Sequence, residues 1–491
     1  MKRTTLRILS VLIAAVIIAA SFTFTAFAAD PPEITAEAGL VIDLTTGEVL
    51  YEKNPDEKLY PASTTKLITA ILVLENLPLN TVLTADAEVA ATGGTRLVMR
   101  TGEQVTAKDA VYELLIGSCN DLAVLLAKAV SGNVEEFARL MNAKAAELGC
   151  TNTHFTNPNG LHDDDHYTTA NDLAKIAVYC MKNATFREIV KYSEYTYTRG
   201  EGSGKSGTVE TMKNGNWLLN NTTAVLYAGN ERRTPKYEGC IGIKTGWTPE
   251  AKGCLVAAAK RGNTTLLSVV LKSGTASASG SYERFSDTIL LLDWGFGNFR
   301  TYSSMRMGTD LGIIPVKKGE FNKVHAVLKD DIYATLGVEQ TDAAVTTKLT
   351  LDESITAPFD KGTVCGKLEV FIDGIKTAEY KAVTAEAIKE GGILSNWGVE
   401  DAVAKKIFGT ILTVVFVLLA IFVAYIAYLK IKSDKKKKLK AARAKARAEA
   451  LEKQRIADEE LLAQMPFYTS KEVPDEDAPA EYTEEAEDAE D

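Results

Sequence analysis

The chain has 491 residues, which is long enough for two or more domains. Hydrophobic residues make up 46% and charged residues 24%, as is typical of globular proteins. The net charge of -10 argues against a nucleic-acid partner, because binding to phosphate backbones requires clustered Lys and Arg.

Cysteine and histidine spacing argues against a metal site. The six cysteines form no C-x-x-C pair, and the four histidines form no H-E-x-x-H motif, which are common arrangements of zinc ligands. No metal or other cofactor is therefore predicted. Spacing alone does not assign disulfides, and we expect the cysteines to be small buried hydrophobic residues.

Residues 1–28 have the parts of a secretory signal peptide. Basic residues precede an apolar run over 8–20, and Ala26-Phe27-Ala28 supplies a small-x-small cleavage pattern. An uncleaved anchor is the alternative, because the apolar run is slightly long for a signal. Under either interpretation the residues that follow are exported.

Residues 33–297 are predicted to form the first domain. Strand patterns over 38–51 come first, and helical periodicity follows over 63–77, 107–116, 121–130, 134–148 and 170–182. Strand patterns return at 240–244, 253–259 and 264–271, before a last helix over 281–294. This order predicts an α/β (α+β) domain in which helices, including an inserted helical subdomain, cover an antiparallel sheet.

Residues 298–390 differ from the first domain in their pattern of apolar and turn residues. Short β-type runs separated by turn residues occur at 312–316, 323–328, 343–351 and 366–372. They predict a small, all-β, sandwich-like domain. Because the segment shows no cluster of chemically reactive residues, we expect it to be a spacer, joined to the membrane by a linker over 391–406.

Residues 407–429 form an apolar run without a charged residue, long enough to cross a hydrocarbon core of about 30 Å as a helix. A buried helix of a soluble protein is the alternative. Clustered lysines follow, so the positive-inside rule places the tail, residues 430–491, in the cytoplasm. The tail begins basic and helical and ends acidic, and we expect its end to be disordered. A single-pass membrane protein is therefore predicted.

Ser63 and Lys66 lie near the start of the first predicted helix. Residues three apart share one face of a helix, so the lysine amine can reach the serine hydroxyl. That hydroxyl is a poor nucleophile until a base takes its proton. A lysine is such a base when burial and a neighbouring cation lower its pKa. The S-x-x-K motif alone is weak evidence, since Ser433-Asp434-Lys435-Lys436 in the tail also contains it.

Two further motifs accompany the pair, Ser118-Cys119-Asn120 and Lys244-Thr245-Gly246. S-x-x-K, a serine–asparagine element and K-T-G together are typical of serine β-lactamases and penicillin-binding proteins. Ser131-Gly132-Asn133 competes for the middle position, but it directly precedes the amphipathic segment 134–148 and is better explained as an N-cap. Ser118 instead lies at a break between two apolar helices, where a polar side chain can face a cleft.

Each motif residue has an expected task. Ser118 can relay a proton between Lys66 and a leaving group, and Asn120 can hold an amide of a substrate. Lys244 places a second cation beside Lys66, which helps to keep the first amine neutral. Gly246 lets a substrate lie close to the strand edge.

The chain resembles the D-alanyl-D-alanine carboxypeptidases, the low-molecular-mass penicillin-binding proteins of the serine β-lactamase/DD-peptidase superfamily, over roughly residues 33–400. The resemblance rests on Ala62-Ser63-Thr64-Thr65-Lys66, Ser118-Cys119-Asn120-Asp121, Asn152-Thr153-His154-Phe155-Thr156-Asn157-Pro158-Asn159-Gly160-Leu161, Gly242-Ile243-Lys244-Thr245-Gly246-Trp247-Thr248 and Glu283-Arg284-Phe285. It implies a β-lactamase/transpeptidase-like fold for the first domain.

The resemblance also implies a reaction. Ser63 would attack the carbonyl between the two terminal D-alanines of a peptidoglycan stem pentapeptide, with Lys66 as general base, and water would release the acyl-enzyme. Backbone N–H groups of Ser63 and Trp247 would form the oxyanion hole. β-Lactam antibiotics such as penicillins would acylate the same serine. The residues that would receive the substrate's terminal carboxylate are Lys244, Thr245 and Arg284.

The sequence departs from the family in two places. Cys119 occupies a position that is usually glycine, either as a reactive thiol or as a packing residue. The usual membrane attachment of the family is an amphipathic C-terminal helix, whereas this chain has a full membrane span and a tail. The tail suggests a partner in the cytoplasm.

Three other functions compete with the carboxypeptidase. A β-lactamase of one class needs a glutamate on a loop after the middle motif, and residues 157–171 contain none. A DD-endopeptidase that cuts peptidoglycan cross-links would share the same motifs. A catalytically silent scaffold that binds the wall would have no need of Ser63 and Lys66 together.

Overall fold

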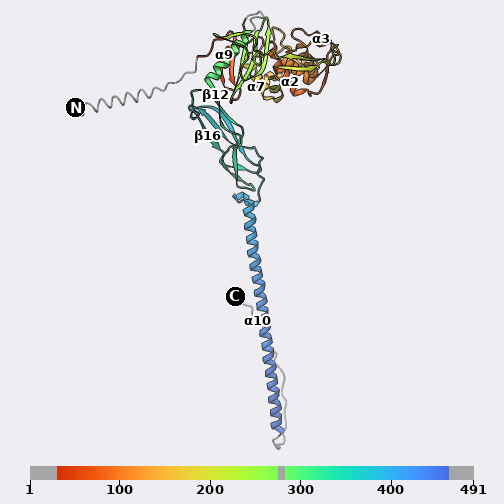
Figure 1. Cartoon of the computed structure of the whole chain (residues 1–491). Coiled ribbons are helices and arrows are strands. Elements are labelled where there is room, and N and C mark those ends of the chain that lie inside the picture. Colours follow the sequence, from red (N-terminus) through yellow and green to blue (C-terminus); the bar gives the residue numbers. More distant parts are fainter. Residues whose placement is uncertain (1–29, 275–281, 464–491) are drawn as a thin grey trace, which may run out of the picture. The chain divides into compact units, whose positions relative to one another are not determined.

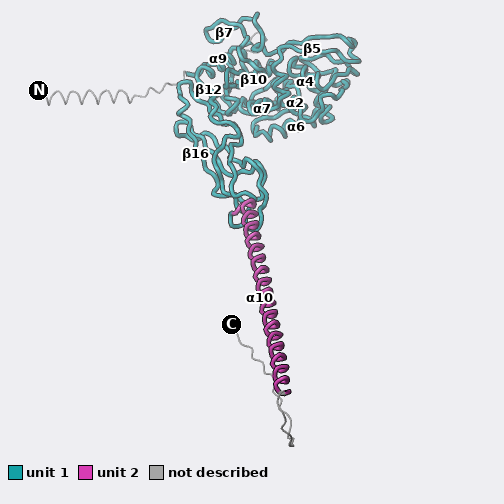
Figure 2. Tube along the Cα trace, turned by 60° about the horizontal axis from the view of Figure 1, so that its bottom comes forward, with its two compact units in different colours: residues 1–398 teal, residues 399–491 magenta. Residues whose placement is uncertain are grey.

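The structure is a computed structural model that describes residues 30–274 and 282–463. The predicted signal peptide, Ser281 at the start of the last predicted helix, and the acidic end of the tail lie outside the described residues. The chain divides into two compact units, residues 1–398 and 399–491 (Figure 2).

A five-stranded antiparallel sheet organises the first domain of the larger unit (Figure 1). In spatial order its strands are β2 (Val49–Lys53), β1 (Ala38–Asp43), β11 (Thr264–Ser273), β10 (Lys252–Arg261) and β9 (Cys240–Thr248). β1 pairs with β11, so the beginning and the end of the domain meet in this sheet. β9 is the edge strand, and no described strand pairs with its outer side, which can therefore pair with another extended chain.

Helices cover both faces of the sheet. Successive side chains of a strand point to opposite faces, so each strand contributes to two cores. Leu40 and Ile42 face one core, whereas Val41 between them faces the other. The first core includes residues of α2 (Lys66–Asn76), α4 (Ala107–Ile116), α5 (Asn120–Ser131), α6 (Val134–Glu147), α7 (Ala170–Lys182) and α8 (Ala184–Ile189). The second core is covered by α9 (Glu283–Asn298).

The predicted α/β class and its antiparallel sheet covered by helices are confirmed, with two details of local structure. Ser63 lies in a 3-10 turn, η1 (Ala62–Thr65), and α2 begins only at Lys66, so Ser63 precedes the α-helix in which we predicted it. The rival triplet 131–133 does provide an N-cap, through the side chain of Asn133, which accepts a hydrogen bond from the backbone N–H of Glu136.

Short elements fill the connections of this domain. They are α3 (Ala87–Ala91) and the strand pairs β3 (Val82–Thr84) with β4 (Gln104–Thr106), β5 (Glu194–Thr198) with β6 (Val209–Lys213), and β7 (Leu226–Ala228) with β8 (Glu231–Arg233). The pair of β5 and β6 packs against α4 near the break that precedes α5.

The segment after α9 is rich in β-structure, as predicted. Its six-stranded sheet has the order β16 (Val345–Leu351), β18 (Val364–Ile372), β19 (Ile375–Thr384), β14 (Lys323–Leu328), β13 (Asp310–Lys317) and β17 (Ile355–Thr356). Two further strands, β12 (Phe299–Met305) and β15 (Ile332–Gly337), form a separate antiparallel pair. Two short 3-10 turns, η3 (Asp342–Ala344) and η4 (Ile393–Trp397), complete it.

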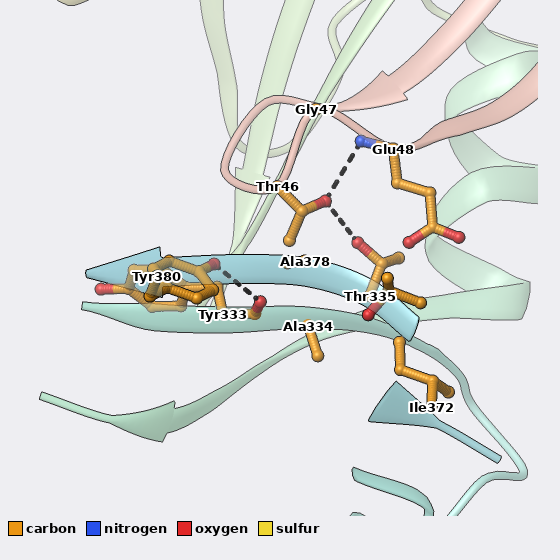
Figure 3. Close-up of a pocket in the computed structure, with 10 residues that line it drawn as sticks. Thr46, Gly47, Glu48, Tyr333, Ala334, Thr335, Ile372, Ala378 and Tyr380 are labelled. Atoms are coloured by element: carbon orange, nitrogen blue, oxygen red, sulfur yellow. Dashed lines mark hydrogen bonds between the residues drawn. The ribbon is translucent and has the colours of Figure 1, made fainter. Parts of the chain in front are cut away.

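A buried carboxylate joins the two domains. Asp43, at the end of β1, accepts hydrogen bonds from the hydroxyls of Thr301 at 2.6 Å and Thr335 at 2.9 Å, both in the β-rich domain. Figure 3 shows Thr335 also hydrogen-bonded to Thr46 in the turn between β1 and β2, at one side of a cavity of about 310 Å³. Because a buried carboxylate that lost these donors would be costly, Asp43 holds the domains together.

The smaller unit consists of one long helix, α10 (Asp401–Ala463). It contains the predicted span over 407–429, and it is long and apolar enough to cross a membrane. None of the side chains in its most apolar window is buried within the protein. Continuous helix satisfies every backbone group inside a bilayer, which suits such an exposed apolar helix.

Glu113 on α4 is a buried acid. Its side chain is 1% exposed, and neither carboxyl oxygen has a hydrogen-bond partner among the described residues. Burial, followed by the negative charge of Asp109, raises the pKa of Glu113 to about 9. The carboxyl group is therefore protonated in the folded protein at neutral pH, whereas in the unfolded chain it ionises near its ordinary value.

We expect Glu113→Gln to stabilise the protein at alkaline pH. Between about pH 5 and 9 the folded state binds one proton more than the unfolded state at this position, so rising pH lowers the free energy of unfolding by about 1.4 kcal/mol per unit. The variant lacks this penalty and should be more stable by about 4 kcal/mol at pH 8. Urea denaturation at several pH values measures the difference. A difference that is independent of pH would contradict a protonated Glu113.

Candidate active site

Ser63 lies in the turn that leads into α2, with its side chain partly exposed. The preceding residue, Ala62, has a φ of 48°, in the left-handed region that non-glycine residues rarely adopt. Such a conformation costs on the order of 1 kcal/mol and is common at functional sites. The kink presents the Ser63 hydroxyl at the start of the helix.

Lys66, three residues later, carries its amine into the protein. The side chain is 0% exposed, and its Nζ lies 2.8 Å from Ser63 Oγ. Nζ also lies 2.7 Å from Asn120 Oδ1 and 2.6 Å from the backbone carbonyl of Asn159. The predicted contact between Ser63 and Lys66 is therefore present, together with two acceptors.

These contacts fit a neutral amine. An uncharged lysine has two N–H donors and one lone pair, while the ammonium form has three donors and no acceptor. The carbonyl oxygens of Asn120 and Asn159 can accept both N–H groups, and the lone pair can then accept the Ser63 hydroxyl proton. Burial, followed by the positive charge of Lys244, holds the pKa of Lys66 well below its ordinary value.

The break between α4 and α5 positions Ser118 and Asn120. Ser118 has a φ of 61°, and Asn120 is the first residue of α5. The Asn120 amide nitrogen donates to the backbone carbonyl of Gly93 at 2.9 Å, which fixes the amide so that Oδ1 faces Lys66. The orientation of the amide follows from this network. The expected placement of polar side chains at this break is present.

Lys244, on the edge strand β9, meets Ser118. Its amine donates to Ser118 Oγ at 2.9 Å and to the backbone carbonyl of Thr245 at 3.0 Å, and its side chain is 2% exposed. Burial, followed by the charge of Arg284, lowers the pKa of Lys244 to about 7. No hydrogen bond joins Ser118 directly to Lys66 among the described residues. The site therefore contains two hydrogen-bonded pairs, Ser63 with Lys66 and Ser118 with Lys244.

Close approach of β9 to the Ser63 turn depends on Gly246. A Cβ atom at this position would lie 2.9 Å from the carbonyl oxygen of Pro61 and 3.0 Å from the backbone nitrogen of Ser63. Such contacts are too short for an ordinary side chain. The close packing of β9 against the Ser63 turn therefore requires glycine at position 246.

The remaining predicted binding residues, Thr245, Trp247 and Arg284, make fewer contacts with the residues of this centre. The Thr245 hydroxyl faces Gly215, whose Cβ would lie 3.1 Å from it. The indole N–H of Trp247 is buried and has no hydrogen-bond partner among the described residues. Arg284, at the start of α9, lies over the ring of Phe285 at 4.6 Å. Its positive charge contributes to lowering the pKa of Lys244.

Cys119 packs beneath the site. The residue is 3% exposed, and burial, followed by the charge of Asp121, raises the pKa of its thiol. A buried thiol that stays protonated is a poor nucleophile. This environment favours the packing alternative for Cys119 over the reactive one.

The sequence does not predict several contacts of the site, mainly because backbone oxygens make them. The carbonyls of Asn159 and Gly93, which hold Lys66 and Asn120, carry no side-chain signature. The one sequence signal for this loop is the Asn159-Gly160 pair, which predicts a tight turn. Gly160 has a φ of 80°. A Cβ on Gly160 would lie 1.9 Å from the Ala62 carbonyl oxygen.

His166 is a further residue of the site whose role the sequence does not indicate. It is buried, with Nε2 at 2.8 Å from the hydroxyl of Thr65, and burial lowers its pKa to about 4. The imidazole is therefore neutral at physiological pH, and it links the loop of residues 157–166 to the turn that holds Ser63. We interpret His166 as a support for the site.

Two protein-family models match the chain. One described as D-alanyl-D-alanine carboxypeptidase covers residues 25–275, and one described as Penicillin-binding protein 5, C-terminal domain, covers residues 299–390. D-alanyl-D-alanine carboxypeptidase DacF of Bacillus subtilis is 32% identical over 403 residues, which are 79% of this chain and 96% of the relative. DacA of Haemophilus influenzae is 29% identical over 403 residues, 80% of this chain and 95% of the relative.

A solved structure agrees with the sequence relatives. Penicillin binding protein 5 from Haemophilus influenzae superposes with a TM-score of 0.60 at 28% identity, over 73% of this chain and 99% of that structure. The similarity extends over the catalytic and the β-rich domains, and 96% of DacF is matched. The chain therefore belongs to the peptidase S11 family of serine-type D-alanyl-D-alanine carboxypeptidases, with the C-terminal domain of penicillin-binding protein 5 after its catalytic domain.

Proposed function

We propose that this carboxypeptidase uses Ser63 as its nucleophile and Lys66 as its general base, with a peptidoglycan stem pentapeptide as substrate. The supporting observation is the buried Lys66 amine at 2.8 Å from Ser63 Oγ, with two carbonyl acceptors for its N–H groups. Ser63 Oγ bonds to the carbonyl carbon between the terminal D-alanines, and its proton passes to Lys66. The C–N bond then breaks, D-alanine leaves, and water hydrolyses the acyl-enzyme.

The oxyanion of this attack would form beside the backbone N–H groups of Ser63 and Trp247. Gly246 supports this role, because a side chain at its position would lie 3.0 Å from the Ser63 nitrogen and would crowd that N–H group. Preorganised donors at such a position stabilise the transition state more than the ground state. The free side of β9 suits an extended peptide that lies along the strand.

Lys244, Thr245 and Arg284 would bind the terminal carboxylate of the substrate. In the free enzyme the pKa of Lys244 is about 7, so part of the population is neutral at physiological pH. An arriving carboxylate favours the charged form of the amine and raises that pKa. Ser118, hydrogen-bonded to Lys244 at 2.9 Å, is then placed to pass a proton to the departing amine.

Replacing Ser63 tests the nucleophile. Ser63→Ala is expected to abolish release of D-alanine from a stem pentapeptide and to prevent formation of a covalent penicillin adduct, because both reactions need the same oxygen. Mass spectrometry of the intact protein detects the adduct, and circular dichroism checks the fold. An adduct that persists for hours in the wild type agrees with a carboxypeptidase, while immediate turnover would indicate a β-lactamase. Undiminished hydrolysis by Ser63→Ala would disprove the assignment.

Replacing Asn120 tests the base. Asn120→Asp puts a negative charge 2.7 Å from the Lys66 amine and should raise its pKa. Since a protonated lysine cannot accept the Ser63 proton, activity is lost as pH falls through this pKa. The acid limb of the kcat/KM profile should therefore move upward by about 1–3 pH units. Cys119→Ser is a neighbouring control that should leave the limb in place, and an unmoved limb in Asn120→Asp would exclude Lys66 as the base.

We also propose that α10 anchors the protein as a single-pass membrane protein, with the catalytic domain outside the cell and residues 430–491 in the cytoplasm. The apolar part of the helix and the lysines after it support this orientation. The soluble domains of such a protein would meet the peptidoglycan peptide. The tail would be available to a cytoplasmic partner.

The orientation can be tested with trypsin, because the tail is rich in Lys and Arg. In sealed, right-side-out membrane vesicles we expect an antibody against the C-terminus to detect an uncut tail. Opening the vesicles with detergent should expose it to cleavage. Loss of the C-terminal epitope in sealed vesicles would place the tail on the outer side.

A further inference from the structure

Three large apolar side chains are exposed at one end of the β-rich domain. Phe321, in the loop between β13 and β14, is 49% exposed, while Ile393 and Trp397, at the two ends of η4, are 80% and 74% exposed. Large apolar side chains that are exposed together, especially with polar residues around them, mark sites of contact with a protein or a membrane. We name these three residues the 321/393/397 surface.

The backbone of this surface is held by hydrogen bonds. The loop that contains Phe321 pairs with the segment before η4, through Gly391 N–H to Lys318 carbonyl at 2.8 Å and Glu320 N–H to Lys389 carbonyl at 3.0 Å. In the η4 turn the hydroxyl of the buried Ser395 donates a hydrogen bond to the backbone carbonyl of Gly392 at 2.6 Å. The exposure of the apolar side chains therefore belongs to the folded domain and does not arise from a frayed end.

Lysines outnumber acidic residues in the two segments that form the 321/393/397 surface. These segments carry four exposed lysines, Lys317, Lys318, Lys323 and Lys389, against two glutamates, Glu320 and Glu390. Between Trp397 and the apolar stretch, two acidic residues, Glu400 and Asp401, are followed by two lysines, Lys405 and Lys406. Apolar and aromatic residues beside an excess of lysines match the chemistry of an anionic lipid surface.

Chain continuity indicates what covers this surface. Trp397 precedes the apolar stretch 407–429 by a short segment, and the domain resumes no strand or buried helix in between. Tryptophan is enriched where a membrane-spanning helix meets the head groups, since its ring is apolar and its N–H is polar. We propose that the 321/393/397 surface lies in the head-group region of the outer leaflet, with its lysines bound to anionic lipids, an inference that rests on the proposed membrane topology.

Such a contact would give the β-rich domain a second attachment besides its covalent link to α10. A spacer tied only through a short linker can swivel, whereas one with apolar side chains inserted in the interface is restricted. Asp43 in turn joins the β-rich domain to the catalytic domain. The lipid contact would therefore restrict the orientation of the catalytic domain above the bilayer.

The test uses the full chain in nanodiscs that contain phosphatidylglycerol and lipids brominated near the head group. The chain has four tryptophans, and Trp217, Trp247 and Trp294 lie in the catalytic domain. Bromine is expected to quench part of the wild-type tryptophan emission, and Trp397→Phe should abolish that loss. Quenching should weaken when phosphatidylglycerol is replaced by a zwitterionic lipid.

A matched control places a tryptophan at the other end of the β-rich domain. Ile375, at the start of β19, is 71% exposed, and its neighbour Ile372 lines the cavity at the junction with the catalytic domain. Ile375→Trp in the Trp397→Phe background should remain unquenched. No quenching in the wild type, or equal quenching in Trp397→Phe, would overturn the proposal. Elution of the protein apart from the nanodiscs would instead contradict the membrane topology on which it rests.

Discussion

Lys66 holds an amine in a fully buried position, and the rest of the catalytic domain is arranged around that group. A buried ammonium ion without a counter-charge would cost several kcal/mol. The carbonyls of Asn120 and Asn159 offer acceptors for two N–H groups and no negative charge, and Lys244 adds a second positive group. This environment favours the uncharged amine, which is the form that can take a proton from Ser63.

Four distant parts of the chain must meet to build this environment. The Ser63 turn, the break between α4 and α5, the loop at 157–160 and the edge strand β9 each contribute one side. Ala62 and Ser118 have left-handed backbone conformations, and Gly160 and Gly246 allow backbone approaches that a side chain would block. The stability of the large helical core is what compensates for such local strain.

Much of this organisation could be predicted from the sequence, because its signals reside in side chains. Hydrophobic periodicity located the helices and strands, and the spacing of Ser63, Lys66, Ser118 and Lys244 indicated their chemistry. The carbonyls of Asn159 and Gly93 could not be predicted, since every residue has one and only the fold decides which carbonyl faces an amine. The burial of Glu113 and the exposure of Trp397 likewise depend on tertiary packing that local patterns do not encode.

The charge state of the Lys66 amine is the claim that can be tested most directly. Neutron diffraction from deuterium-exchanged crystals at neutral pD locates each deuteron on Lys66 Nζ and Ser63 Oγ. We expect two deuterons on Nζ, directed at Asn120 Oδ1 and the Asn159 carbonyl, and one on Ser63 Oγ that points to Nζ. Three deuterons on Nζ, one of them directed at Ser63, would contradict the account.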